Sequence, residues 1–429
     1  MSDTPLQSSV NFAAIAGRLP PAPGVVVHSA FAQPGYLLER FADASADFAG
    51  ATVYSLMPMS EPAYGAPAVV ESLNLVTFFP GTGLRRTVNQ GLATIDRQNL
   101  SDIPGLFSTG KRHADLVLLQ VSAPNADGDV SLGIAVDYLP AVLAQKPFVV
   151  AQVNPRMPFT AGDTRLSLGD IDVCVDVDEP LTELPASAGD AVESAIADHV
   201  AGLVEDGDVL QAGIGSLPDL VLARLDHLKH LGGHTGIITA AWRRLIEAGV
   251  VDNSRKKRFA GTTVTTMAGG DAGFYTFLDN NPAIEFHACD QTHGREVLAA
   301  IDGLCAINSV LQMDLAGNAN AETVNGRRIA AIGGLADFAG GASRAPGGKS
   351  IIALRSAFRQ RDSGELVSNM IPRLDGNAPL SLASDSIDFV VTEYGVAPLR
   401  GLNADARARA LIGIAHPSFR DDLSRSSGC

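Results

Sequence analysis

The segment VLQAGIGSLPDLVLARL, residues 209–225, passes from a short apolar run through a glycine turn into apolar residues at helical spacing. This order predicts a β-strand, a tight turn and an α-helix, with Pro218 in the first turn of the helix. Gly213 and Gly215 remove side chains where a ligand can approach the backbone, although many such turns contain glycine for tight packing alone. The segment therefore predicts a βα unit whose turn is a candidate cradle for an anion. The apolar face of the predicted helix consists of Leu217, Val221, Leu225 and Leu228.

Similar short apolar runs recur along the chain, with helical segments between them. Strands of four to six apolar residues, each bounded by turn residues, are typical of a parallel sheet that is covered on both faces. The fold class predicted from this pattern is α/β, with open and mostly parallel sheets. The predicted strands lie at residues 116–121, 148–153, 209–211, 351–354 and 389–391.

Proline, serine, glycine and acidic residues replace the apolar periodicity in DEPLTELPASAGD, residues 178–190. Such a change marks a linker, so we expect two α/β domains, residues 1–185 and 186–429. Apolar residues four apart predict a helix over residues 192–204, at the start of the second domain. Residues 331–348 are rich in glycine and are expected to form a long irregular loop, which in a compact domain is usually functional or disordered.

The composition is that of a globular protein, with 46% hydrophobic and 18% charged residues. The formal net charge is -15, and the only notable basic run is the short cluster at residues 255–258. This balance argues against a nucleic acid as partner. An acidic protein can still bind an anion locally, through backbone amides at helix N-termini and a few well-placed cations.

The cysteines of the chain, Cys174, Cys289, Cys305 and Cys429, show neither a CxxC pair nor the spacing of a metal site. They are expected to be reduced thiols, and no metal cofactor is expected. The N-terminal sequence lacks the cationic start and apolar core of a secretion signal, and no stretch approaches the roughly 20 apolar residues of a membrane span. We therefore expect a cytoplasmic protein that does not associate with a membrane.

Distinctive segments follow one another in both halves of the chain, at residues 116–158, 211–225, 231–235, 274–285, 306–322, 332–354, 391–401 and 414–423. In content and order they resemble the acetyl-CoA hydrolase/transferase family of class I CoA-transferases, which includes 4-hydroxybutyrate CoA-transferase. The resemblance runs from roughly residue 70 to the C-terminus. So many ordered matches argue against a chance resemblance.

The resemblance implies an enzyme that acts on acyl-CoA, with CoA held mainly by the C-terminal domain, and a homodimer as the assembly. In this family a glutamate carboxylate attacks the acyl-CoA carbonyl, and a glutamyl-CoA thioester forms through an acyl anhydride. Such chemistry needs a carboxylate nucleophile, an oxyanion site made of backbone or amide donors, and exclusion of water from the intermediate.

The family's functional positions can be carried over to individual residues. Gly333 and Gly334 match a glycine pair whose backbone lies at the thioester carbonyl, so Gly334 is a candidate oxyanion donor. Lys349 matches a position that can meet a CoA phosphate or carbonyl, or it is a solvated loop lysine. Glu393 and Tyr394 match a strand-end signature that can serve domain packing or substrate closure. The CoA-binding loop of the family matches Gly213, Ile214, Gly215, Ser216 and Leu217.

The chain departs from the family pattern at the catalytic position. In the family the catalytic glutamate follows a His-Thr pair, whereas here Gly236 follows His234 and Thr235. An ungapped count back from Ile307 places His293 where the pattern has an asparagine close to the glutamate. A neutral imidazole can donate a hydrogen bond to an oxyanion as an amide does, or it can act as a general base near pH 7.

Three functions remain open from the sequence. The first is an acyl-CoA enzyme with altered chemistry, in which His234, His293 or a bound water drives hydrolysis or direct acyl transfer to an amine or alcohol. The second is a conventional carboxylate CoA-transferase that uses another carboxylate. The third is a non-catalytic CoA-binding or regulatory protein, which the intact glycine-rich loop and C-terminal signatures make less favoured than the first. The candidate carboxylates for the second function are Glu285, Asp271, Asp290 and Asp337.

Overall fold

The computed structural model describes residues 6–360 and 362–427, so Cys429 lies outside the described residues. The chain folds into two compact units. A single boundary after residue 185 does not describe them fully, because two later segments return to the first unit. The first unit comprises the described residues up to Pro185, Val264–Thr292 and Arg328–Gly333, and the second comprises Ala186–Thr263, His293–Arg327 and the described residues from Gly334 onward.

The first unit is built on a parallel sheet. Its strands are β1 (Leu6–Gln7), β2 (Gly24–Val27), β3 (Thr52–Leu56), β4 (Asn74–Phe79), β5 (Thr94–Ile95), β6 (Leu116–Val121), β8 (Phe148–Val153) and β11 (Val173–Asp176). They lie in the order β1-β11-β8-β6-β2-β3-β4-β5, and each neighbouring pair is parallel. β6 and β8 have the bounds expected from their continuous apolar runs, which confirms those two strands.

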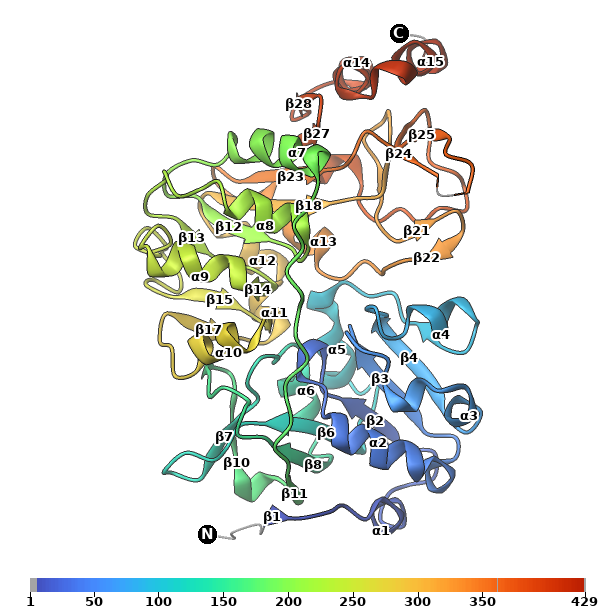
Figure 1. Cartoon of the computed structure of the whole chain (residues 1–429), viewed down its shortest axis with the longest axis vertical. Helices are drawn as coiled ribbons and strands as arrows, with labels where there is room; N and C mark the ends of the chain where they lie inside the picture. Colours follow the sequence, from blue (N-terminus) through green and yellow to red (C-terminus); the bar gives the residue numbers. More distant parts are fainter. Residues whose placement is uncertain (1–5, 361, 428–429) are drawn as a thin grey trace. The chain divides into compact units, whose positions relative to one another are not determined.

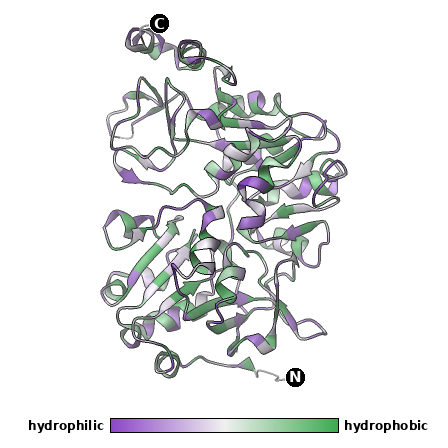
Figure 2. Cartoon of the chain, turned by 180° about the vertical axis from the view of Figure 1, so that it is seen from behind, coloured by the Kyte–Doolittle hydropathy of each residue, from purple (hydrophilic) through white to green (hydrophobic). Residues whose placement is uncertain are grey.

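Short helices and aromatic side chains complete the first unit. Phe12, Phe41 and Phe48 pack together, with ring centroids between 4.9 and 6.0 Å apart. Hydrophobic residues predominate along the central strands of the sheet (Figure 2), as burial on both faces requires. The helices are α1 (Phe12–Ala16), α2 (Gly35–Asp43), α3 (Pro67–Val70), α4 (Arg85–Asn89), α5 (Ile103–Ser108), α6 (Leu139–Leu143), α10 (Ala272–Leu278) and α11 (Cys289–Thr292).

The second unit contains a second, mostly parallel sheet. Its strands are β12 (Val209–Ala212), β13 (Gly232–Gly233), β18 (Leu304–Ser309), β23 (Lys349–Ala353), β27 (Phe389–Thr392) and β28 (Gly395–Pro398). They lie in the order β13-β12-β18-β23-β27-β28, and only the pair β27 and β28 is antiparallel among the described strands of this sheet. The strands expected at 209–211, 351–354 and 389–391 are present with slightly different ends, so the predicted α/β class with mostly parallel sheets is confirmed.

Helices cover this second sheet, and their bounds are α7 (Ala191–Ala201), α8 (Ser216–Leu222), α9 (Ala240–Glu247), α12 (Arg295–Ala299), α13 (Leu335–Ala342), α14 (Ala404–Ile414) and α15 (Arg420–Ser427). α7 packs against α8, β23 and β27, whereas α13 packs against α12, β18 and β23. Asp190 caps α7 by accepting a hydrogen bond from the Glu193 amide at 3.0 Å. No helix in the described part of the chain is long and apolar enough to cross a bilayer.

Short strands lie outside the two main sheets. Their bounds are β7 (Asp129–Ser131), β9 (Ala161–Gly162), β10 (Arg165–Ser167), β14 (Ile237–Thr239), β15 (Thr263–Thr265), β16 (Met267–Gly269), β17 (Ile284–Phe286), β19 (Gln312–Asp314), β20 (Ala319–Asn320), β21 (Thr323–Val324), β22 (Arg327–Arg328), β24 (Ala357–Arg359), β25 (Leu366–Ser368) and β26 (Met370–Ile371).

The glycine-rich stretch at 331–348 is not the continuous loop that we expected, because it contains α13. Phe338 and Ala342 are buried one helical turn apart on this helix. Gly341 lets α13 approach α12 closely, since a Cβ atom at this position would lie 2.4 Å from the Cβ atom of Leu298. The glycine content therefore serves helix packing here rather than an irregular backbone.

The helix after the glycine turn is shorter than expected. α8 ends at Leu222, so Leu225 and Leu228 lie beyond it, although Leu225 is still buried. The guanidinium of Arg224 donates to the Leu220 carbonyl at 2.8 Å, and the guanidinium of Arg244 donates to the Leu222 carbonyl at 3.2 Å. These bonds satisfy carbonyl groups of the last turn, which lets the helix stop early.

Candidate functional site

The strand order of the second unit reverses beside β12 (Figure 1). The chain leaves β12 towards β13 on one side, and it later continues from β18 towards β27 on the other side. In an open parallel sheet, ligands bind outside the carboxyl ends of the strands at such a reversal. At this end a pair of side-chain amides joins β12 and β18, because Asn308 Nδ2 donates to Gln211 Oε1 at 2.9 Å. The loops that follow β12 and β13 therefore lie where such a sheet usually binds a ligand.

The loop at residues 213–217 directly follows β12 and has an open backbone. Gly215 has φ of +128°, a conformation that favours glycine. A Cβ atom at Gly213 would meet nothing within 4 Å, and Ile214 is 36% exposed. The loop is thus accessible along its backbone, as the binding of a ligand to this segment requires.

Hydrogen bonds hold the segment after β13 beside the loop at 213–217. The hydroxyl of Thr235 donates to the carbonyl of Ala212, the last residue of β12, at 2.9 Å. The hydroxyl of Thr239 donates to Oδ1 of Asp219 in α8 at 3.1 Å. Burial raises the pKa of Asp219, while this hydrogen bond acts in the opposite direction. The structure therefore brings Gly236 to the same end of the sheet as the glycine turn.

Gly236 leaves room for the imidazole of His293. A Cβ atom at position 236 would lie 2.5 Å from Nε2 and 2.9 Å from Cε1 of His293, closer than real Cβ atoms approach other groups. Gly236 does not adopt a left-handed backbone conformation, so its backbone would accept alanine. The need for glycine at this position comes from space, and Gly236 and His293 form one local arrangement.

Gly334 and Phe338 also border the His293 ring. A Cβ atom at Gly334, the N-cap residue of α13, would lie 2.6 Å from Cδ2 and 2.7 Å from Nε2 of the ring. The ring of Phe338 meets the imidazole edge to face, with centroids 4.8 Å apart. His293 is only 2% exposed. Two glycines and one aromatic ring therefore fix the imidazole in place.

Burial also fixes the charge of this histidine. It lowers the pKa of His293 to about 3, so the imidazole is neutral at neutral pH. The low pKa makes His293 a poor general base near pH 7, which leaves hydrogen-bond donation as the role that its environment supports. His234 is also fully buried, and its amide donates to the Leu210 carbonyl at 2.9 Å. The Phe338 ring centroid lies 6.4 Å from that of His234.

Two more residues were singled out from the sequence, and one of them, Gly333, directly precedes Gly334. Gly333 belongs to the first unit, where its carbonyl accepts a hydrogen bond from the Leu100 amide at 3.0 Å. Lys349 is the first residue of β23, at the amino ends of the parallel strands and thus opposite the glycine turn. Its ammonium donates to Glu205 at 2.9 Å and to Asp208 at 3.0 Å. These partners give Lys349 a structural role at the amino ends of the strands.

Lys349 and Asp208 also influence each other's titration. Burial acts to lower the pKa of Lys349, but its hydrogen bonds to Glu205 and Asp208 outweigh burial and raise that pKa. Burial raises the pKa of Asp208, and Lys349 acts against this shift. The lysine is therefore a charged member of a partly buried network at the start of the strand.

The candidate replacement carboxylates have other contacts. Asp271 caps α10, because its Oδ1 accepts from the Phe274 amide at 2.8 Å. Glu285 accepts from Nε2 of His287 at 3.0 Å, and both residues belong to the first unit. Asp337 is 1% exposed in the first turn of α13. None of these contacts singles out a displaced nucleophile.

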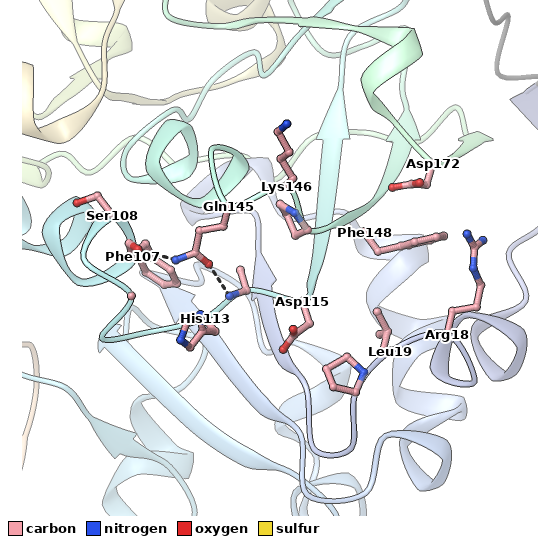
Figure 3. A pocket seen from close by; sticks show the side chains of 14 residues that line it. Arg18, Leu19, Phe107, Ser108, His113, Asp115, Gln145, Lys146, Phe148 and Asp172 are labelled. Carbon is pink, nitrogen blue, oxygen red and sulfur yellow. Dashed lines mark hydrogen bonds between the residues drawn. The ribbon is translucent and has the colours of Figure 1, made fainter.

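A pocket of about 640 Å³ lies in the first unit, at the amino ends of its strands (Figure 3). Two acidic residues line it, and both serve strand ends. Asp115 accepts from the Gly24 amide and Asp172 accepts from the Val149 amide, each at 2.8 Å. Because ligands of open α/β sheets bind at the carboxyl ends, this pocket is not the candidate site.

Two family models match the chain. The N-terminal domain of acetyl-CoA hydrolase/transferase matches residues 66–184, and the C-terminal domain matches residues 270–427. The 4-hydroxybutyrate coenzyme A transferase of Clostridium kluyveri is 36% identical over 400 residues, which cover 93% of this chain and 92% of that protein. The chain belongs to the acetyl-CoA hydrolase/transferase family. The resemblance stated from the sequence motifs is thereby confirmed.

Solved structures of relatives have the same fold. RipA from Yersinia pestis superposes with a TM-score of 0.89 at 28% identity, over 98% of this chain and 99% of that chain. The 4-hydroxybutyrate CoA-transferase of Porphyromonas gingivalis superposes with a TM-score of 0.79 at 32% identity, over 96% of this chain and 95% of that one. Because the relatives include CoA-transferases and acetyl-CoA hydrolases, the expected enzyme class, acting on CoA thioesters, is supported.

Sequence reasoning missed two residues that shape the site. Phe338 escaped notice because the stretch around it was interpreted as a loop, although its spacing to Ala342 is that of a helix face. Thr235 was treated only as part of the His-Thr motif, and its hydrogen bond to the end of β12 has no signal in the sequence. Both residues hold other groups in place rather than offering chemistry themselves.

Proposed function

We propose that this protein binds acyl-CoA at the loop 213–217 and cleaves the thioester by hydrolysis or by direct acyl transfer, without a glutamyl intermediate. One observation carries the proposal. Position 236, which the motif resemblance aligns with the nucleophile of the family, carries no carboxylate, and the space for any side chain is occupied by the buried ring of His293. A carboxylate nucleophile would also need to be aimed within a fraction of an ångström.

Two features of the second unit support the binding of acyl-CoA. The glycine turn after β12 has an accessible backbone at the strand-order reversal, the usual position of a ligand in such sheets. Gly334 brings a backbone amide to the start of α13 beside His293, and a fixed backbone donor suits a developing oxyanion. These groups bind and polarise a thioester without requiring an enzyme-bound acyl group.

The experiment is to incubate the protein with a panel of acyl-CoAs and to measure free thiol and acyl products. Parallel reactions contain no acceptor, a carboxylate, an amine or an alcohol. Thiol release without an acceptor indicates hydrolysis, and release only with an amine or alcohol indicates direct transfer. Exchange with free carboxylates and a CoA adduct on the protein would instead show a conventional transferase. Tight CoA binding without any thiol release would overturn both hydrolysis and direct acyl transfer as functions of this protein.

A pair of variants tests the role of position 236. Gly236→Glu alone is expected to be inactive or poorly folded, because the new side chain meets the His293 ring. The double variant Gly236→Glu with His293→Asn restores both residues of the family pattern and removes that obstacle. It is expected to gain carboxylate exchange and a CoA-sized mass increase on the glutamate. No exchange in a folded double variant would mean that other parts of the site have also diverged.

A further inference from the structure

The position of His293 relative to Gly334 assigns a specific role to its ring. Nε2 lies 2.7 Å from the point that a Cβ atom of Gly334 would occupy, so the nitrogen lies directly beside the backbone of that residue. The same nitrogen is the ring atom nearest to the point that a Cβ atom of Gly236 would occupy, at 2.5 Å. The ring thus presents one polar atom both at Gly236, the proposed position of the missing nucleophile, and beside the backbone of Gly334.

We propose that His293 is a catalytic residue whose Nε2–H donates a hydrogen bond to the carbonyl oxygen of the CoA thioester beside the Gly334 backbone, and that Gly236 is glycine because the ring needs its space. This inference rests on the function proposed above. A single change, from a glutamate and an asparagine to a glycine and a histidine, then accounts for both departures from the family pattern. The histidine occupies the place of the nucleophile and supplies the donor that an amide supplies elsewhere.

The surroundings of the ring suit a donor. A neutral imidazole carries one N–H group and one acceptor nitrogen, and burial keeps His293 neutral. Phe338 packs edge to face on it, and with 2% exposure the ring has little freedom to rotate. A donor that is already in place when the oxyanion forms needs no reorganisation during the reaction.

The reaction balances without a protein nucleophile. The oxygen of water, or the nucleophilic atom of an amine or alcohol, forms a bond to the thioester carbon, and the carbonyl electron pair moves to the oxygen that His293 and Gly334 stabilise. The tetrahedral intermediate then collapses, the carbon–sulfur bond breaks, and CoA leaves as the thiolate. The proton lost by the acceptor passes to that thiolate, directly or through solvent, so that free CoA and the acid, amide or ester are the products.

Rates of His293 variants with the acyl-CoA that the panel identifies test the donor role. His293→Ala removes the donor, and losing one oxyanion donor typically lowers kcat by about 100-fold or more. KM should change little, because the interaction forms in the transition state. His293→Asn keeps an N–H donor and should retain much more activity than His293→Ala. The ratio of wild-type to His293→Asn rates should stay constant between pH 5.5 and 8.5.

Three results would overturn the donor role. Wild-type kcat in His293→Ala would show that the ring does not contact the reacting oxygen. A rate ratio that changes about tenfold through pH 6 to 7 would show that His293 acts as a base instead. Equal losses in His293→Asn and His293→Ala would point to packing rather than donation.

A stability cycle tests the spatial half of the proposal independently of activity. Gly236→Ala, His293→Ala and the double variant are compared by thermal unfolding. Gly236→Ala should lower the unfolding midpoint by several degrees, and the same substitution in the His293→Ala background should cost little. Gly413→Ala is the control, since Gly413 lies in α14, has an ordinary backbone conformation and has nothing within 4 Å of an added Cβ atom.

Failure of this inference and failure of the proposed function give different patterns. If no acyl-CoA is cleaved but the cycle shows strong coupling, the function is wrong and the donor role falls with it, while the steric pairing stands. If acyl-CoA is cleaved but Gly236→Ala is silent in both stability and rate, the proposed function stands and the inference about His293 is wrong.

Discussion

Each of the two sheets has a buried ionisable side chain near its strand-order reversal, and the surroundings of the two groups differ. In the second unit, Gly236 and Gly334 border Nε2 of His293, so backbone lies beside the polar atom of the ring. In the first unit the order reverses between β2 and β6, and Asp137 lies there, close to Ser29, which follows β2. Asp137 is fully buried and has φ of +35°, an uncommon conformation outside glycine.

The neighbours of Asp137 are hydroxyl groups. Within the described residues, no hydrogen-bond partner is found for Asp137 Oδ2 or for the hydroxyls of Ser29, Tyr64 and Tyr138, all of them buried. Burial raises the pKa of Asp137 to about 6, and the Tyr138 amide and the nearby Ser29 hydroxyl act against this shift. Small residues around His293 leave room for a neutral ring, whereas burial gives Asp137 a pKa near neutral pH in spite of the polar groups beside it.

The largest expected effect concerns the pH dependence of stability through His293. Its folded-state pKa of about 3 lies below the ordinary value of 6.5, so the unfolded chain binds a proton first as the pH falls. His293 therefore costs nothing above pH 6.5 and destabilises the folded state increasingly between pH 6.5 and 3. At pH 4.5 the cost is about 3 kcal/mol, from roughly 1.4 kcal/mol per pH unit over two units.

Denaturant unfolding of the wild type and His293→Asn at pH 7.5 and 4.5 measures this term. The wild type should lose more stability on acidification than the variant, by about 3 kcal/mol. Burial also lowers the pKa of His28, to about 4. Its contribution is the same in both proteins and cancels when their losses of stability between pH 7.5 and 4.5 are compared. Identical slopes would mean that the ring of His293 can reach water and is not held as described.

Asp137→Asn is expected to change the pH dependence of the unfolding free energy somewhat less than His293→Asn does, and in the opposite direction: it should stabilise the protein at high pH rather than at low pH. Since the folded-state pKa of Asp137, about 6, lies above its ordinary value of 3.8, its contribution is fully present below pH 3.8 and is lost as the pH rises through 6. Asparagine tolerates the backbone conformation and can keep the bond to the Tyr138 amide. The variant should be more stable than the wild type by up to about 3 kcal/mol at pH 8, from a shift of roughly two units.

The check is the difference in unfolding free energy between wild type and Asp137→Asn at pH 4, 6 and 8. The difference should shrink towards pH 4, where the wild-type carboxyl is protonated in the folded state. A constant difference at all three pH values would show that the substitution changes packing and not ionisation, and the contrast with His293 would then lose its electrostatic basis.

Gly341→Ala should have an intermediate effect confined to the second unit. The added Cβ atom would lie 2.4 Å from the Cβ atom of Leu298, which is anchored to the backbone of α12. The two helices must separate, and such overpacking typically costs about 1–3 kcal/mol. Gly340→Ala is the matched control, because its Cβ atom closely approaches only the end of the Arg344 side chain, at 2.9 Å, and that end can move. Equal thermal stability of the two variants would contradict the close approach of α12 and α13.

The sequence predicted the sheets better than the loops, for a physical reason. Strands such as β6 are buried along their whole length, so their apolar residues form continuous runs with clear ends. α13 was missed because glycine weakens helix propensity, and only packing against Leu298 makes Gly341 favourable there. Tertiary contact overrode local preference in this helix.

The candidate site was predictable only in part. Gly236 and His293 could be singled out by comparing motifs, but their contact joins residues far apart in the chain and has no local signal. Lys349 was singled out by its motif alone. The direction of β23 places it at the amino ends of the strands, and strand direction follows from the topology rather than from the motif.

The smallest expected effect on stability is that of Gly213→Ala. This variant separates a glycine that faces open space, Gly213, from a glycine that borders a buried ring, Gly236. Gly213 has an ordinary backbone conformation, and an added Cβ atom meets nothing within 4 Å, so the unfolding free energy should change by less than about 0.5 kcal/mol. Calorimetric titration should nevertheless show weaker CoA binding, because the methyl group projects into the space in which a ligand would approach the loop. Unchanged affinity in a variant of unchanged stability would place CoA elsewhere. Glycine at 213 would then be explained neither by packing nor by a ligand, unlike glycine at 236, whose need for space is set by the protein itself.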